Sequence, residues 1–300
     1  MNSLKVIVGS VIVLSGALAL AQPHTAPQAS KPPASQAVQK EVDKQAAQAA
    51  QEKRRQLVGE AQSAIAETEK ALVALKDNRT KEALAALALA TGKLEIILAR
   101  NPKLALAPVR TDAVTHELLA TDDAVKVALK EARRLLNDGE VQKARQLLAT
   151  LASEIELRTL NIPLNTYPAA IKAVTPLIDA GNTEEAITKL QTLLDTLVVT
   201  TEIIPLPRLR AGEEIKAAQA LAEKKNRSKD EGEKMAQHLS AAREQLKLAD
   251  LLGYGDKKDF QPMYEQIDQI AKNTEGGKSG LGWFERIKRQ IAELGKARSS

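Results

Sequence analysis

The sequence contains no cysteine, few aromatic residues and, beyond its first residues, no long hydrophobic run. The absence of cysteine excludes disulfides, thiolate metal sites, thiol nucleophiles and a lipid-accepting cysteine. Aromatic residues make up only 2% of the chain. Its stability must therefore come mainly from the packing of small aliphatic side chains.

The only long apolar run lies at the N-terminus. Lys5 precedes an apolar stretch from Val6 to Leu20, which ends in the small-any-small pattern Ala19-Leu20-Ala21. A membrane-spanning helix needs about 20 apolar residues, so the run is typical of a signal peptide. We expect cleavage near Ala21, a periplasmic or otherwise exported location, and no stable membrane insertion of the mature chain. The alternative is an uncleaved N-terminal anchor.

The net charge of +5 is small for a chain in which 27% of the residues are charged. Lys and Arg alternate with Asp and Glu instead of clustering in a stripe, as they do in nucleic-acid-binding proteins. The short basic run from Lys53 to Arg55 is interpreted as a solvated helix face. We expect no nucleic-acid partner.

Composition divides the chain into three parts: a signal peptide at 1–21, a flexible Pro/Ala/Gln-rich tether at 22–45, and a helical domain at 46–300. The tether has too few large apolar residues to offset the entropy lost on ordering.

Three similar passages predict helical hairpins. In each, a helix ends at a left-handed Asn or Gly, and an alanine five residues later marks close approach of the next helix. The three turns end at Asn78, Gly139 and Gly181. Their unequal spacing differs from the fixed period, about 34 residues, of a tetratricopeptide array. We therefore predict an all-α fold, a multi-helix bundle built from antiparallel helical hairpins.

Prolines mark further boundaries. Helices are predicted over residues 210–225 and 229–252. A β-branched run from Leu197 to Ile204 precedes Pro205. Because no partner strand is predicted elsewhere, we interpret this run as the buried end of a helix.

The aromatic residues gather near the C-terminus. They are expected to dock this segment on the bundle, since each buries roughly 150–250 Å². The alternative is an interaction surface for a ligand or partner. The residues concerned are Tyr254, Phe260, Tyr264, Trp283 and Phe284.

This same segment resembles the C-terminal signature of the YfdX family, and the middle of the chain contains similar blocks. The resemblance covers about residues 50–295 and excludes the tether. The C-terminal motifs are Leu252-Gly-Tyr-Gly255, Lys257-Lys-Asp-Phe260, Tyr264-Glu-Gln-Ile267 and Gly276-Gly-Lys-Ser-Gly280 before Gly282-Trp-Phe284. The upstream blocks include Ala90-Thr-Gly-Lys-Leu-Glu95, Val114-Thr-His-Glu-Leu-Leu119, Thr166-Tyr-Pro-Ala-Ala-Ile171 and Ile203-Ile-Pro-Leu-Pro207.

The resemblance implies an all-helical fold, export, self-association into a homo-oligomer, and a loose link to envelope stress. It implies no reaction, no cofactor and no catalytic residues.

Two motif fragments are rejected as chemical sites. Gly276 to Ser279 lacks the first glycine and the preceding strand of a phosphate-binding loop. His116-Glu117 lacks the second histidine of a zinc-protease helix. His116 is interpreted as a helix-packed histidine, with a pH sensor as the alternative. His116 and Tyr167 are the residues expected near any ligand-binding cavity.

The leading hypothesis is a non-enzymatic exported protein of the bacterial envelope, related to stress, that shields unfolded clients or binds small apolar molecules. The first alternative is a helical-hairpin adaptor for a specific envelope protein. An unrecognised hydrolase is the third hypothesis, and it would need catalytic groups that meet only through the fold. We expect no enzyme activity, no metal and no cofactor.

Overall fold

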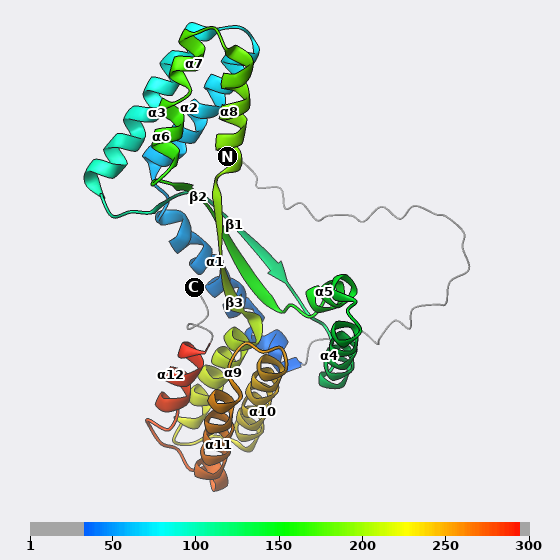
Figure 1. The fold of residues 1–300 in the computed structure, drawn as a ribbon. Coiled ribbons are helices and arrows are strands. Elements are labelled where there is room, and N and C mark those ends of the chain that lie inside the picture. Colours follow the sequence, from blue (N-terminus) through cyan, green and yellow to red (C-terminus); the bar gives the residue numbers. More distant parts are fainter. Residues whose placement is uncertain (1–32, 295–300) are drawn as a thin grey trace.

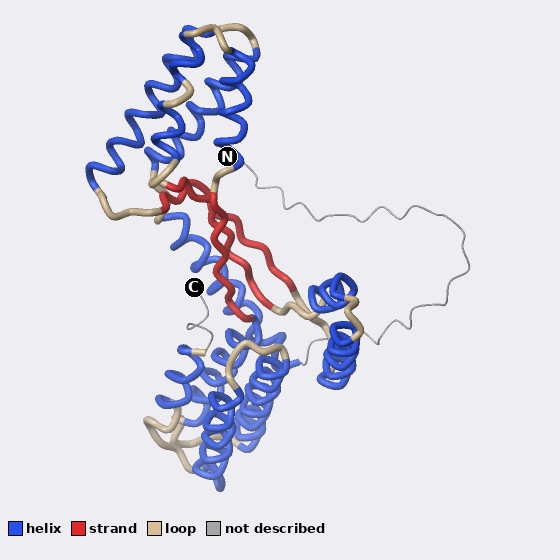
Figure 2. Tube along the Cα trace, viewed as in Figure 1, coloured by secondary structure: helices blue, strands red, loops and turns tan. Residues whose placement is uncertain are grey.

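The computed structural model describes residues 33–294, and side chains from residue 36 onward. Two helical lobes lie at opposite ends of a narrow three-stranded sheet (Figure 1), and helices predominate in the described chain (Figure 2). The hairpin lobe, as we call it, consists of α2 (Gly59–Lys76), α3 (Thr80–Arg100), α6 (Tyr167–Lys172), α7 (Thr175–Asp179) and α8 (Thr183–Asp195). A separate hairpin of α4 (Asp122–Asn137) and α5 (Val141–Ala149) connects β1 to β2.

The three predicted hairpin turns are confirmed. Asn78, Gly139 and Gly181 have left-handed backbones, with φ of 58°, 76° and 78°. The residue after each donates its N–H to the carbonyl five residues back, at 2.8 Å in all three turns. This bond closes a Schellman motif and satisfies a carbonyl that the helix end would leave unpaired. The alanine five residues after each turn is completely buried, as the close approach of two helices requires.

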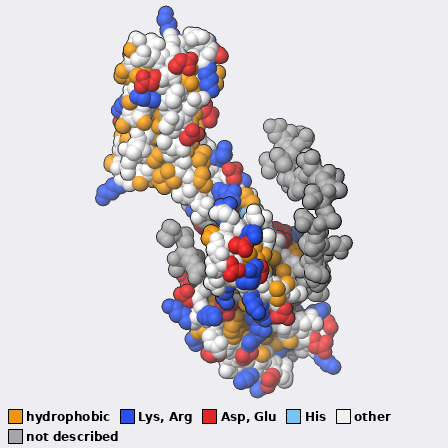
Figure 3. Space-filling model, turned by 45° about the vertical axis from the view of Figure 1, so that its right-hand side comes forward, with side chains coloured by type: hydrophobic (Ala, Val, Ile, Leu, Met, Phe, Trp, Pro, Cys, Tyr) orange, Lys and Arg blue, Asp and Glu red, His pale blue; other side chains and the backbone are white. Residues whose placement is uncertain are grey.

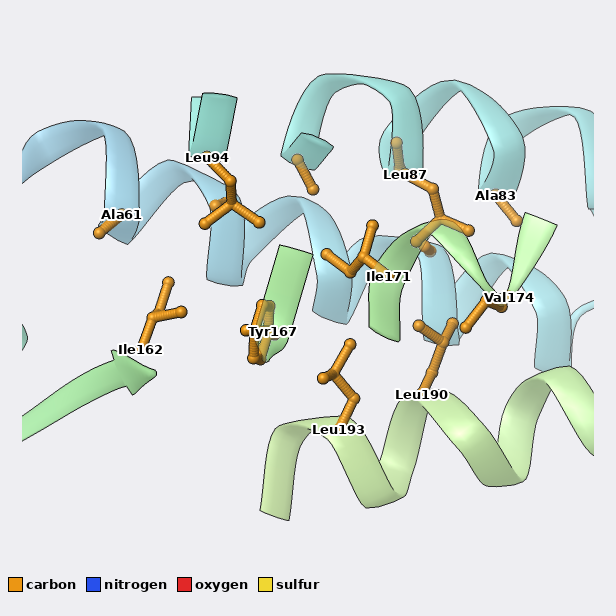
Figure 4. Packing of buried hydrophobic residues seen from close by; sticks show 14 of the residues in the cluster. Ala61, Ala83, Leu87, Leu94, Ile162, Tyr167, Ile171, Val174, Leu190 and Leu193 are labelled. Atoms are coloured by element: carbon orange, nitrogen blue, oxygen red, sulfur yellow. The ribbon is translucent and has the colours of Figure 1, made fainter. Parts of the chain in front are cut away.

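Small residues dominate the core of the hairpin lobe. Buried alanines allow α2 and α3 to approach closely, and larger side chains such as Leu87, Leu94 and Ile171 fill the remaining space (Figure 4). Tyr167 lies among them and is fully buried. The lobe thus achieves a packed interior almost without aromatic residues.

An antiparallel sheet of order β1-β2-β3 connects the two lobes. Its strands are β1 (Leu106–His116), β2 (Glu154–Pro163) and β3 (Val198–Pro205). The prediction of an all-α fold is therefore confirmed only in part: the described chain is mostly helical, and it also contains this sheet. The interpretation of 197–204 as the end of a helix is wrong for the same reason.

The partner strand that seemed to be missing is β2. Ile155 and Leu157 are buried on one face, while Arg158 is exposed, an alternation that fits a half-buried strand. The β-branched residues of β3 pair with this strand in register from Val198 to Pro205. In β1, the register shifts between Pro108 and Arg110, which an edge strand tolerates because a proline there breaks no inner ladder bond.

Helix α1 (Pro33–Arg55) lies against the sheet. Val38, Val42 and Ala50 are buried with residues of β2 and β3 in a small core. The flexible tether predicted at 22–45 is therefore wrong from residue 33 onward, because this apolar stripe covers the sheet. The predicted signal peptide at 1–21 lies outside the described residues.

The second lobe, which we call the aromatic lobe, is a bundle of four helices. Its helices are α9 (Leu206–Ala222), α10 (Lys229–Leu251), α11 (Lys257–Thr274) and α12 (Glu285–Glu293), with the short 3₁₀ helix η1 (Glu275–Gly277) after α11. The predicted helices at 210–225 and 229–252 correspond to α9 and α10. The Ser228 hydroxyl and the Glu231 carboxylate form a capping box that starts α10. Among residues 33–294, no helix is both long and apolar enough to cross a membrane.

Candidate functional site

A cavity of about 460 Å³ lies between α1, α9 and α12. This volume falls within the range of small-molecule sites, roughly 300–1,000 Å³. Three helices from distant parts of the sequence supply its lining: Gln45 from α1, Arg208, Leu209, Gly212, Glu213 and Lys216 from α9, and Lys288, Ile291 and Ala292 from α12. The cavity therefore exists only in the folded chain.

The sequence leaves space here because two of the lining residues are small. Gly212 has no side chain, and a Cβ placed on it would lie 3.7 Å from Cγ2 of Ile291. That distance is an ordinary van der Waals contact, so a methyl group would fit and a longer side chain would extend further. Ala292, on α12, also lines the cavity. Leu209 and Ile291 add apolar surface, which gives the cavity an apolar wall.

The charged residues of the cavity differ in how they are paired. The Glu213 carboxylate is buried and accepts hydrogen bonds from the Gln45 amide and, at 2.5 Å, from Nζ of Lys216. Lys288 donates to Glu285 at 3.0 Å. Both of these charges are therefore balanced by a neighbouring residue.

Arg208 is the exception. Its Nη1 donates to the carbonyl of Ala292 at 3.3 Å, while its Nε is buried without a hydrogen-bond partner. Burial lowers the pKa of this guanidinium, and the negative charges of Glu202 and Glu293 oppose the shift. Within residues 36–294, no carboxylate forms an ion pair with Arg208.

The structure places His116 and Tyr167 in different parts of the fold. His116 ends β1, where its Nε2 lies 3.4 Å from Oε1 of Glu156, so the interpretation as a helix-packed histidine is wrong. The β-sheet that the sequence prediction missed explains this error. Tyr167 lies in the core of the hairpin lobe, where burial raises its pKa to about 12 (Figure 4). Neither residue lines the cavity.

The five C-terminal aromatic residues lie in the aromatic lobe itself. Phe260 and Phe284 are completely buried in its core, whereas Tyr254, Tyr264 and Trp283 are partly buried. The first two thus stabilise the interior, and an interaction surface stays a prediction for the other three. Burial raises the pKa of Tyr264 to about 12.

Tyr254 joins the aromatic lobe to the sheet. Its hydroxyl donates to Oε2 of Glu154 at 2.7 Å and accepts from the N–H of Ser153 at 2.9 Å. Burial is the main cause that raises the pKa of Tyr254, and the hydrogen bond to Glu154 acts in the same direction. The two bonds fix the start of β2 against the segment that follows α10.

The sequence prediction missed a set of buried charges on α9. Arg210 is 3% exposed and donates to Glu117 at 2.5 Å, while the completely buried Glu214 lies 2.6 Å from Nδ1 of His238 on α10. Such residues are rarely buried unless they are paired. The only sequence signal is that charges occur around the whole circumference of this helix. Within residues 33–294, no group of three or more His, Asp or Glu residues could hold a metal ion.

Comparison with known proteins finds a family match for the middle of the chain. Residues 64–203 match the family model described as YfdX protein. These residues are therefore similar to the YfdX family. This match is shorter than the resemblance expected over 50–295. It covers the hairpin lobe from within α2 and continues through the sheet into β3.

A solved structure of Salmonella Typhi YfdX is similar to part of this chain. The sequences are 17% identical, and the match covers 50% of this chain and 93% of the other at a TM-score of 0.35. A score this low carries no argument about the arrangement of the lobes. No curated protein matches the chain.

The cavity lies outside the part of the chain that matches the YfdX family model. All of its lining residues precede residue 64 or follow residue 203. On the face shown in Figure 3, acidic and basic side chains are interspersed over both lobes, as the charge pattern of the sequence predicts. The recess between α1, α9 and α12 is thus the candidate site that the described structure offers for a small ligand.

Proposed function

We propose that this protein is a YfdX-family member and an exported, non-enzymatic binding protein of the bacterial envelope, and that the cavity between α1, α9 and α12 holds a small molecule. The single observation that carries the binding role is this cavity, with an apolar wall and an incompletely paired arginine. Small-molecule sites commonly combine an apolar lining with a few polar groups that orient the ligand. Export rests on the sequence of residues 1–21.

The other parts of this proposal rest on the family resemblance. They are self-association, a role in envelope stress and the shielding of unfolded clients. Light scattering of the protein without residues 1–21 measures the first. A monomeric mass over the whole concentration range would contradict self-association.

A neutral fluorescent probe, N-phenylnaphthylamine, tests the binding role. Its fluorescence should rise on addition of the protein, and Gly212→Met should abolish the rise because the new side chain fills the cavity. Gly212→Ala is the matched control, since its methyl group makes only an ordinary contact with Ile291. Equal fluorescence with all three proteins would place the probe elsewhere and contradict the proposal.

An adaptor for a specific envelope protein is the second candidate. It is favoured by the α4–α5 hairpin, which exposes four large apolar side chains, namely Val127, Leu136, Val141 and Leu148. Recovery of one stoichiometric partner in pull-downs, lost when Val127 and Val141 are replaced by serine, would favour the adaptor. Suppression of aggregation in unrelated proteins would favour the shielding of clients.

A further inference from the structure

The charges around the cavity indicate which class of ligand it binds, and this inference about the ligand rests on the proposed binding function. Lys216 and the Gln45 amide already bind the Glu213 carboxylate, and Lys288 binds Glu285. After these pairs are formed, Arg208 is the cationic group of the cavity that lacks a carboxylate partner among the described residues.

The surroundings of Arg208 leave hydrogen-bonding capacity unused. A guanidinium has five N–H donors, and the structure gives Arg208 one long bond to a carbonyl and a buried Nε with no partner. The carboxylates of Glu202 and Glu293 act on Arg208 without forming an ion pair with it, and Glu202 is bound to Lys53 at 2.7 Å. A buried N–H without a hydrogen-bond partner, such as this Nε, is costly, and an anion in the cavity would remove that cost.

The apolar lining of the cavity favours a ligand with an apolar group. Leu209 and Ile291 line the cavity, and Gly212 leaves the space between them open. The volume of about 460 Å³ suits one small molecule rather than a segment of membrane. We infer that the cavity binds a free amphipathic anion, with a carboxylate or similar head group on Arg208 and an apolar chain between α9 and α12.

Calorimetric titration of the protein without residues 1–21 tests this inference with four probes: octanoate, octanol, octyltrimethylammonium and acetate. Octanoate should bind about tenfold more tightly than octanol, because it adds a charge-assisted hydrogen bond to Arg208. Acetate should bind weakly, since it lacks the apolar chain. The preference should persist in high salt, because a buried pair is poorly screened.

Arg208→Gln should remove the roughly tenfold preference for octanoate over octanol and leave octanol binding unchanged. Arg286→Gln is the matched control, because Arg286 is exposed on α12 and does not line the cavity. It makes the same change in net charge and should keep the preference. Circular dichroism of both variants verifies that they are folded.

The outcomes separate the ligand class from the binding function. Equal affinity for octanoate, octanol and octyltrimethylammonium, lost together in Gly212→Met, would overturn the anion preference and leave the proposed function standing. Loss of the preference in Arg286→Gln as well would assign it to overall charge and also overturn the inference. Binding of none of the three, or binding that Gly212→Met leaves intact, would overturn the proposed function itself.

Discussion

Replacing Gly181 by alanine should destabilise the hairpin lobe, whereas the same replacement at Gly92 should stabilise it. Gly181 ends the turn between α7 and α8 with φ of 78°, and Gly92 lies within α3. A Cβ added at either position would meet no atom within 4 Å. The two substitutions therefore differ in backbone conformation and not in packing, and both act on the same lobe.

The expected magnitudes follow from that conformation. An alanine in the left-handed region costs about 1–2 kcal/mol. Alanine in a helix interior is more stable than glycine by about 0.5–1 kcal/mol. Gly181→Ala and Gly92→Ala should thus differ in free energy of unfolding by roughly 1.5–3 kcal/mol, with opposite signs relative to the parent protein.

Urea unfolding followed by circular dichroism measures this difference. The two lobes have separate cores, so the chain can unfold in more than one step, and the variants are compared in the transition that both of them shift. A Gly181→Ala protein as stable as the parent would refute the assignment of this turn. A destabilising Gly92→Ala would refute the placement of Gly92 in an open part of α3.

Three further outcomes are expected. Tyr254→Phe should lower the stability by about 1–3 kcal/mol, because a buried Glu154 loses its donor, and an unchanged urea midpoint would contradict the junction. Burial raises the pKa of Tyr167 to about 12, so its contribution to stability is complete below pH about 10 and is lost as the pH rises toward 12. Tyr167→Phe should therefore reduce the loss of stability over this pH interval, measured by alkaline unfolding with tyrosinate absorbance. An identical pH profile for the variant and the parent protein would exclude this role. Leu87→Ala should lower the free energy of unfolding in urea by about 2–5 kcal/mol. Leu89→Ala, at a side chain that is 53% exposed, should lower it much less. Equal losses would contradict the assignment of Leu87 to the buried face and Leu89 to the exposed face of α3.

The hairpins could be predicted from sequence because turn chemistry is local. A left-handed Asn or Gly, followed five residues later by alanine, carries the whole signal within a few residues. The gathering of aromatic residues also indicated burial near the C-terminus, which Phe260 and Phe284 show. The helices predicted at 210–225 and 229–252 were visible because Pro205 and Pro207 mark the boundary before them.

The sheet could not be found in the same way. Its strands lie at 106–116, 154–163 and 198–205, and each strand pairs with residues that are about 40 positions away or more in the sequence. A β-branched run without a visible partner was therefore assigned to a helix. The alternation of Ile155 and Leu157 with charged residues was the local signal for the second strand. His116 lies on a strand rather than on a helix because β1 pairs with this second strand.

The cavity could not be predicted either, because its lining comes from residues 45, 208–216 and 288–292. The burial of Arg210 and Glu214 is also invisible in the sequence, where a charged helix face normally indicates solvent. It arises because α1 and α10 both pack on α9. Tertiary packing, rather than any local pattern, determines this region.

A crystal structure of the protein without residues 1–21, soaked with octanoate, tests the central claim most directly. We predict electron density for the ligand between α9 and α12, with its carboxylate on the guanidinium of Arg208 and its chain against Ile291. Density for octanoate only at another place on the protein, with the cavity filled by water, would contradict the claim that this cavity is the binding site.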